Sequence, residues 1–286
     1  MKHLYRQISY TCLMLMLSLV AIAQDSVQLT ILHTSDMHSR VQPFDRKAVN
    51  NYAGMGGLLR RTVLVDEQRK EDADLLLFDC GDFSQGTPYY NLFKGKVEIE
   101  MMNFMHYDAI TIGNHEFDFG LENMANLFKQ AQFPVVCANY DFTGTILESL
   151  VKPYIILERK GLKIGVFGLS PKMEGLVQAN KCMGVTFSDP YLKAQEMADL
   201  LRNKEHCDLV ICLSHLGLQG FTASDCCDEE MVAKTHGIDL ILGGHSHTYM
   251  NGAKNYLNQQ GKTVPILHSG SNGVFVGKMV MTLENN

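Results

Sequence analysis

Five apolar segments of this 286-residue chain are each followed directly by residues that can bind a metal ion. A segment such as 75–78, which reads Leu-Leu-Leu-Phe, is apolar at every position, as is typical of a β-strand buried on both faces. Parallel strands end side by side at one edge of a sheet, so residues far apart in sequence can share one pocket. The residues in question are two carboxylates, four imidazoles and one amide: Asp36, His38, Asp82, Asn114, His215, His245 and His247.

The order of the predicted elements indicates an α/β protein, because strand-like runs alternate with helix-like segments. In the helix expected over 56–70, Leu58, Leu59, Val63 and Leu64 are predicted to lie roughly on one face. The last strands follow one another without helices, which predicts a mixed sheet. The predicted strands are Val27–His33, Leu75–Cys80, Ala109–Ile112, Val135–Ala138, Tyr154–Glu158, Lys163–Leu169, Asp208–Ser214, Asp239–Leu242, Val264–His268 and Val274–Leu283; the other predicted helices are Val97–Met105, Leu121–Gln130, Tyr191–Asn203 and Asp228–Thr235.

The first 23 residues predict a signal peptide. Lys2 and Arg6 precede an apolar stretch over 11–20, and Ala21-Ile22-Ala23 then gives a small-residue cleavage pattern. The apolar stretch is short for a membrane-spanning helix, although an uncleaved anchor is the alternative. We therefore expect residues 24–286 to form one periplasmic or secreted domain, with no later transmembrane segment.

The net charge of −6 argues against a groove for nucleic acid, which would need a basic surface. An acidic protein that acts on an anionic substrate needs local positive charge, and bound metal ions can supply it. Beyond the signal segment there are seven cysteines, an odd number that cannot all pair internally. Cys80, Cys137 and Cys212 lie in apolar runs and are expected to be buried, while a single bridge among the other four remains open.

The seven candidate ligands are too many for one tetrahedral ion and suit two ions that share a carboxylate. Asp36 and His38 are one residue apart, as are His245 and His247. Alternate residues of an extended segment point the same way, so each pair is expected to face the metal site. Asp82 is the remaining strand-end carboxylate and the natural bridge between the ions. Each string alone also fits a solvated turn, but all five together favour a site.

The string Gly113-Asn114-His115-Glu116 is the most informative of the five. The amide oxygen of Asn114 can bind a cation, while His115 would point into the site without being a ligand. Asp118 is placed to accept the other N–H of that imidazole and so to fix its orientation. His115 is then available to stabilise charge or to protonate a leaving oxygen.

Two ions with oxygen and imidazole ligands suit in-line displacement at phosphorus. They would lower the pKa of a bridging water and give the attacking hydroxide. The mixed ligands admit Zn, Mn, Fe or Co. A Ser-His-Asp hydrolase is disfavoured because the G-x-S-x-G string is absent.

The remaining histidines are expected to have structural roles. His33 lies within the first strand and is predicted to be a core histidine with satisfied hydrogen bonds. His106, His206 and His236 follow helices and are expected near the surface. His268 precedes Ser-Gly-Ser-Asn-Gly at a strand end, where a supporting role at the site or at the substrate edge is open.

Several strings, in this order, resemble the calcineurin-like metallophosphoesterases, and more closely the metallophosphatase domain of secreted and periplasmic 5′-nucleotidases. They are LTILHTSDMHSR, GGLLRR, FDCGDFSQGTPYYNLFKG, YDAITIGNHEFDFG, FPVVCANY, SHLG and GIDLILGGHSHT. The resemblance implies a four-layer αββα sandwich that hydrolyses phosphate monoesters, with nucleoside 5′-phosphates as substrates. It also implies a catalytic dyad of His115 and Asp118, one ion on Asp36, His38, Asp82 and His247, and the other on Asp82, Asn114, His215 and His245. At the position of His247 the family varies between Gln, Asn and His.

Members of that family usually continue into a second domain that carries the base-stacking aromatics and substrate-binding arginines. This sequence stops after the metallophosphatase domain, so we expect either a separately encoded nucleotide-binding domain or a less selective phosphatase that acts alone. A phosphodiesterase of the same fold, for instance one acting on 2′,3′-cyclic nucleotides, is an alternative activity. From another class, a non-enzymatic metal-binding or scaffold subunit is the rival hypothesis.

Overall fold

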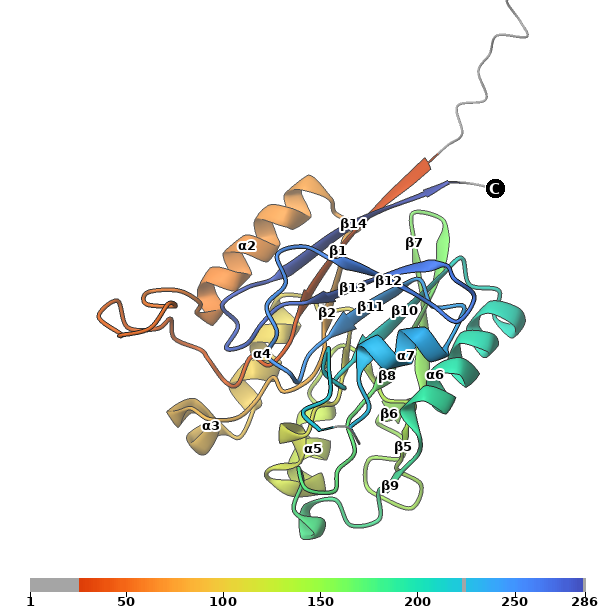
Figure 1. Cartoon of the computed structure of the whole chain (residues 1–286). Helices are drawn as coiled ribbons and strands as arrows, with labels where there is room; N and C mark the ends of the chain where they lie inside the picture. The colour runs from red at the N-terminus through yellow and green to blue at the C-terminus, as the bar shows by residue number, and fades with distance from the viewer. Residues whose placement is uncertain (1–25, 223–224, 285–286) are drawn as a thin grey trace, which may run out of the picture.

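A computed structural model describes residues 26–222 and 225–284 (Figure 1). The predicted signal peptide over 1–23 lies outside these residues. In the described part of the chain, the strands form two six-stranded sheets and one two-stranded sheet. No helix among these residues is long and apolar enough to cross a membrane.

The first sheet has the strand order β14-β1-β2-β3-β4-β6. Its strands run parallel except β14, which pairs antiparallel with β1. The five parallel strands therefore place their carboxyl ends along one edge. The bounds are β1 Ser26–Thr34, β2 Leu76–Asp79, β3 Ala109–Thr111, β4 Val135–Val136, β6 Val151–Lys152 and β14 Gly277–Glu284.

The second sheet has the order β12-β13-β11-β10-β8-β7, with β7 and β12 antiparallel to their neighbours. The predicted neighbouring strands β7 and β8 form a hairpin that turns at Lys160 and Gly161, both with positive φ. The mixed character expected of the late strands is confirmed. The bounds are β7 Tyr154–Arg159, β8 Leu162–Leu169, β10 Leu209–Ser214, β11 Leu240–Gly243, β12 Lys254–Leu257 and β13 Thr263–His268, and the small sheet pairs β5 Tyr140–Asp141 with β9 Thr186–Phe187.

Helices cover the outer face of each sheet, so the four expected layers are present (Figure 1). One core joins the first sheet to α2, α4 and α5, through residues such as Leu77, Val65 and Met102. The other core fills the space between the sheets and beneath α6 and α7. The helices are α2 Leu58–Glu71, α3 Pro88–Phe93, α4 Lys96–Phe104, α5 Gly120–Phe128, α6 Pro190–Asp199 and α7 Asp228–Lys234, with short 3₁₀ or π turns η1 His115–Phe117, η2 Ala179–Lys181 and η3 Leu200–Lys204.

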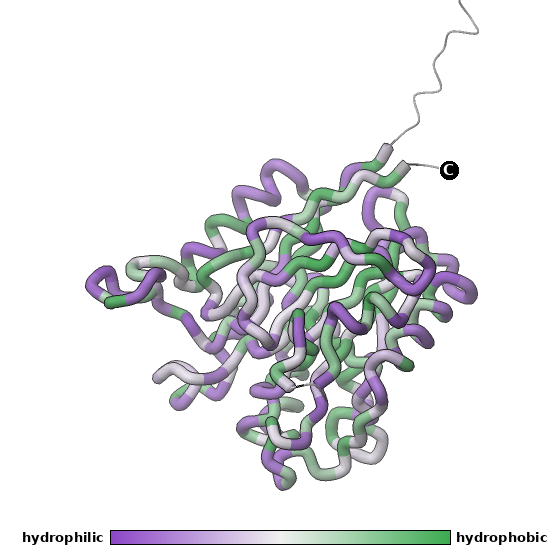
Figure 2. The backbone as a smooth tube through the Cα atoms, in the orientation of Figure 1, coloured by the Kyte–Doolittle hydropathy of each residue, from purple (hydrophilic) through white to green (hydrophobic). Residues whose placement is uncertain are grey.

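Hydrophobic residues concentrate in the central strands and hydrophilic ones on the outer helices and loops (Figure 2). The two sheets approach closely where β8 crosses β3 and β4. A Cβ on Gly168 would collide with the carbonyl oxygen of Val136 and the hydroxyl of Thr111. A glycine at this position therefore lets the sheets pack at their observed separation.

The apolar face predicted for α2 is buried only in part. Leu59 and Val63 are 71% and 56% exposed, whereas Leu58 and Val65 are buried together with Arg61. Arg61 is accommodated because its guanidinium donates to the carbonyl oxygen of Gly273 at 3.0 Å. The buried face of α2 thus includes a hydrogen-bonded arginine, which hydrophobic periodicity does not predict.

Candidate metal centre

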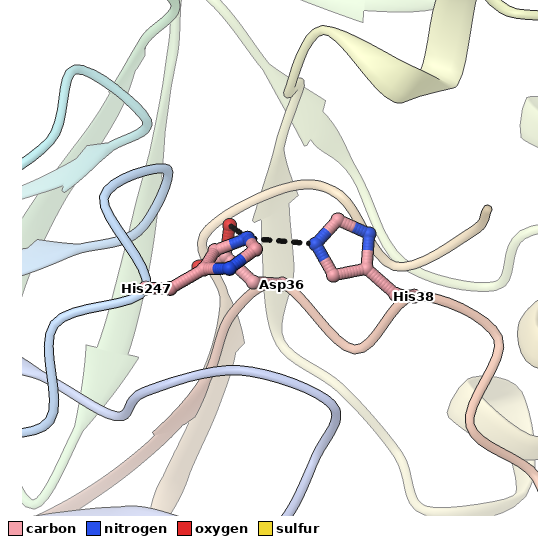
Figure 3. A group of neighbouring side chains, drawn as sticks. All are labelled: Asp36, His38 and His247. Atoms are coloured by element: carbon pink, nitrogen blue, oxygen red, sulfur yellow. Dashed lines mark hydrogen bonds and ion pairs between the residues drawn. The ribbon is translucent and has the colours of Figure 1, made fainter. Parts of the chain in front are cut away.

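The seven predicted ligands converge at the carboxyl ends of five strands, which come from both sheets. Asp36 and His38 follow β1, Asp82 follows β2, and Asn114 follows β3. The second sheet supplies the other three, since His215 follows β10 and His245 and His247 follow β11. His38 Nε2 and His247 Nε2 lie 2.9 Å apart although 209 positions separate them in sequence (Figure 3).

These side chains form two groups, in each of which the candidate ligand atoms lie within 4.8 Å of one another. One group is Asp36, His38 and His247, and both sheets contribute to it. The second is Asp82, His215 and His245. Two adjacent clusters with mixed oxygen and imidazole donors are what a pair of divalent ions requires.

The backbone at most of these ligands is left-handed. The φ angles are 49° at Asp36, 45° at His38, 56° at Asp82, 73° at His245 and 54° at His247. The prediction that each D-x-H or H-x-H pair alternates along an extended strand is therefore wrong, although both pairs do face the site. Non-glycine residues with positive φ are uncommon and cluster at functional sites, where the surrounding structure holds them.

Backbone hydrogen bonds between neighbouring loops hold these strained turns. The N–H groups of Asp36 and His38 donate to the carbonyl oxygens of Gly81 and Asp82 at 2.9 and 3.0 Å. Across the sheets, the N–H of His245 donates to Asp36 Oδ1 at 2.9 Å. The strand-end loops of the two sheets are thus tied to one another directly at the site.

Glu116 lies beside the candidate ligands, and the sequence pattern assigned it no role. Its buried carboxylate accepts the backbone N–H of Gly113 at 2.6 Å, of Asp82 at 3.0 Å and of Phe83 at 3.1 Å. It therefore fastens the loop after β2 to the loop after β3. Its only sequence signal is its place directly after His115, because backbone partners leave no residue pattern.

Three buried atoms of the candidate ligand residues have no hydrogen-bond partner among the described residues: Asn114 Oδ1, His38 Nδ1 and His215 Nε2. Orphaned buried polar atoms are costly, so they indicate a missing partner. His215 Nε2 lies 3.1 Å from Asp82 Oδ2 without hydrogen-bond geometry, while its Nδ1 is 2.5 Å from the carbonyl oxygen of Cys80. The residues present thus fit divalent ions of the Zn, Mn, Fe or Co type.

One imidazole compensates for the charge of the buried carboxylates. Burial alone would lower the pKa of His215, but Asp82 and Asp36 outweigh it and raise that pKa to about 10. Burial likewise favours a raised pKa at Asp82, yet the His215 cation holds it well below its usual range. Desolvation wins at Asp36, where it raises the pKa to about 7. The cavity therefore has a strong preference for positive charge.

The other imidazoles are held in their neutral form, which is the form that binds metal. Burial lowers the pKa of His38 and of His245 to about 4 each, and lowers that of His247 as well. The charge of the His215 cation lowers the pKa of all three rings further.

His115 and Asp118 lie at the rim of the site. His115 Nδ1 is 3.0 Å from Asp118 Oδ2, and the two side chains are 28% and 34% exposed. Burial would lower the pKa of His115, but the hydrogen bond to Asp118 and the charge of Asp82 raise it. One pocket of about 450 Å³ is lined by His115 and by the candidate ligands Asn114, His38, His245 and His247. The His115–Asp118 pair therefore borders the same pocket as the two metal groups.

His33 is buried as predicted, but the expectation of satisfied hydrogen bonds is wrong. Neither ring nitrogen has a partner among the described residues. His268 is also buried, and its Nε2 is 2.8 Å from Asp228 Oδ2. Asp228 in turn accepts from Ser214, the residue before His215, so His268 is connected to a candidate ligand's strand.

The other histidines and the cysteines are mostly where they were expected. His106 and His206 are exposed, and His236 is partly buried against Gln195. Cys80, Cys137 and Cys212 are buried, and the seven cysteines, all among the described residues, are unpaired.

Comparison with known proteins places this geometry in a family. Residues 29–249 match the family model described as calcineurin-like phosphoesterase. The chain is 32% identical to the snake venom 5′-nucleotidase of Crotalus adamanteus over 93% of its own length and 47% of that protein. It is 34% identical to the 5′-nucleotidase of Homo sapiens over 78% of this chain and 38% of that one.

The fold agrees with these relationships. The structure matches that of the 5′-nucleotidase precursor from Thermus thermophilus with a TM-score of 0.80 and 28% identity, covering 90% of this chain and 54% of that one. The chain thus spans about half the length of its relatives or less. The matched residues include every candidate ligand and the His115–Asp118 pair, so the protein belongs to the calcineurin-like phosphoesterase family of hydrolases and is related to the 5′-nucleotidases.

Proposed function

We propose that this protein hydrolyses phosphate monoesters, with nucleoside 5′-phosphates as its substrates, at a centre of two divalent metal ions. The observation that carries the proposal is the pair of adjacent ligand groups on strained strand-end turns, with His115 beside them. The nucleoside part rests on the related 5′-nucleotidases. We further propose that residues 24–286 act as one metallophosphatase domain.

One ion would be held by Asp36, His38, Asp82 and His247. The other would be held by Asp82, Asn114, His215 and His245. Asp82 is suited to the bridge, because it belongs to one ligand group and its charge also acts on His38 and His247 of the other. When bound, the ions would supply Lewis acidity to the phosphoryl oxygens and to the attacking water.

His115 would deliver a proton to the leaving oxygen. In the reaction, the oxygen of water bonds to phosphorus, the phosphorus–oxygen ester bond breaks, and the products are an alcohol and inorganic phosphate. Asp118 supports the protonated imidazole through Nδ1, which leaves Nε2 free to meet the leaving group. The raised pKa of His115 is consistent with a general acid near neutral pH.

Export from the cytoplasm is part of the proposal, and it rests on the pattern of residues 1–23. The expected mature form begins at Gln24 and is periplasmic or secreted. N-terminal sequencing of the protein recovered from cell fractions tests this directly. A cytoplasmic protein that retains Met1 would refute it.

The test is a substrate panel on the mature chain reconstituted with Zn, Mn, Fe or Co. A chromogenic phosphate monoester, the matching diester and several nucleoside 5′-phosphates are compared, with and without a candidate second subunit. Hydrolysis of monoesters in preference to the diester supports the proposal. Preference for the diester would indicate a phosphodiesterase, and no hydrolysis with any of the metals would favour the scaffold subunit.

A further inference from the structure

Arg40 places a permanent positive charge beside the metal groups. Among the described residues that line the pocket of about 450 Å³, Arg40 is the only lysine or arginine. It lies two positions after His38, on the turn that begins at the end of β1. The remaining lining includes Gln85, Thr87 and Asn272, which are neutral polar residues.

The guanidinium of Arg40 is held in place yet has no anionic partner. Its central carbon lies 4.1 Å from the centre of the Phe44 ring, a cation–π contact that restrains the side chain. Within residues 26–222 and 225–284 it forms no ion pair, and its Nε is buried without a hydrogen-bond acceptor. The guanidinium groups of Arg61 and Arg202, by contrast, donate to carbonyl or carboxylate oxygens.

An arginine without an ion pair is unexpected in a site this rich in acids. Asp36, Asp82 and Asp118 all lie at the same strand ends, yet none of them pairs with Arg40. Their charges face the histidines and, under the proposed function, the ions. Arg40 is thereby left available for an anion that enters the pocket from solvent.

We propose that Arg40 binds a charged phosphoryl oxygen that a monoester carries and a diester lacks, so that it selects monoesters; this rests on the proposed function. A monoester has three non-bridging oxygens and nearly two negative charges at neutral pH. In a diester, one of those oxygens carries a second organic group and the charge falls to one. The planar guanidinium suits the extra anionic oxygen, and its N–H groups would meet a neutral ester oxygen less favourably.

The decisive variant is Arg40→Gln, with Arg46→Gln as its matched control. Arg46 belongs to the same loop and is exposed, but it does not line the pocket. With the metal-loaded protein, kcat and KM are measured for p-nitrophenyl phosphate and for bis(p-nitrophenyl) phosphate. Arg40→Gln should raise KM for the monoester on the order of 10- to 100-fold and change the diester values by less than about threefold. Arg40→Lys should recover part of the loss.

Binding of inorganic phosphate, measured by calorimetry, gives a second readout that needs no turnover. It should weaken in Arg40→Gln by a similar factor and stay unchanged in Arg46→Gln, with metal content and melting temperature equal in all three proteins. Equal losses on monoester and diester, or an unchanged KM and phosphate affinity, would overturn the proposal. If wild type hydrolyses neither ester, the proposed function fails, while the phosphate measurement still decides whether Arg40 is an anion site.

Discussion

Glu116 accepts the backbone N–H of Asp82 at 3.0 Å with the same oxygen that accepts the N–H of Gly113 at 2.6 Å. One buried carboxylate thus sets the spacing between the β2 and β3 loops, and with it the position of Asp82 relative to Asn114. In Glu116→Gln, an amide NH₂ replaces one acceptor and faces a backbone donor. We expect metal affinity to fall by about 10- to 100-fold, as measured by calorimetry on the metal-free protein.

The control for that experiment is Glu122→Gln, an exposed position on α5. It should bind metal like wild type. If Glu116→Gln also binds metal with wild-type affinity, Glu116 does not position the ligand loops.

His115→Ala should slow turnover by about 10²- to 10⁴-fold and leave the metal content near that of wild type. The reason is that His115 borders the pocket and bonds to Asp118, while both ligand groups are complete without it. Steady-state kinetics measures the turnover, and elemental analysis of the same sample measures the metal content. A variant that has lost its ions would show that His115 is a ligand. His106→Ala, at an exposed site, is the control.

Ligand deletions should separate a bridging residue from a terminal one. Asp82→Ala is expected to abolish high-affinity binding of both ions, because both proposed coordination sets include its carboxylate. His247→Ala should lower the stoichiometry by about one ion only, since His247 belongs to one group and is partly exposed. Titration with competing chelators measures the number of ions bound tightly. An Asp82→Ala protein that still holds one ion tightly would contradict the bridge.

His33 should make folding stability sensitive to acid. Burial, together with nearby His268, lowers the pKa of His33 from 6.5 to about 3, so the folded protein resists its protonation. The unfolded chain takes up this proton below about pH 6.5, and the folded one only near pH 3. Above pH 6.5, His33 therefore does not change the free energy of unfolding. As the pH drops from 6.5 towards 3, it lowers this free energy, by about 2 kcal/mol at pH 5.

His33→Leu removes this titration, so its free energy of unfolding should decline less between pH 7 and pH 5 than that of wild type. Denaturant unfolding at both pH values, with equal metal loading, gives the difference. His206→Leu, at an exposed position, serves as the control. Parallel pH profiles for wild type and His33→Leu would rule out the buried neutral histidine as a cause.

The sequence was sufficient for the strands that end at the site and for the edge at which the site forms, but it did not predict β5, β6, β9 or β12. Apolar runs that end in Asp, Asn or His locate both the strands and this edge. A strand buried on two faces is apolar at every position and is therefore easy to recognise. The local geometry was not predictable in the same way. Asp36 and His38 adopt left-handed turns since hydrogen bonds to the β2 loop hold them there, and no short string encodes those contacts.

The sequence also did not predict the roles of residues whose hydrogen-bond partners are backbone groups or groups far away in the chain. Glu116 bonds to N–H groups, which nearly every residue carries, so nothing in the sequence marks its role. On α2, Leu59 is exposed, while Arg61 is buried and donates to a carbonyl oxygen 212 positions away. Hydrophobic periodicity indicates which face of a helix is apolar. It does not indicate which polar groups can be buried because they form hydrogen bonds. His33 shows the converse, a buried polar ring left uncompensated among the residues that the structure describes.

His38 and His247 lie 209 positions apart in sequence, and each comes from a different sheet. No nascent or partly folded chain that lacks either sheet can offer the full set of donors. An ion that binds only the native state stabilises that state by mass action, so its effect acts on the docking of the two sheets. Under the proposed function, metal loading would thus add stability to the contact between the two sheets, beyond that of the apolar core that joins them.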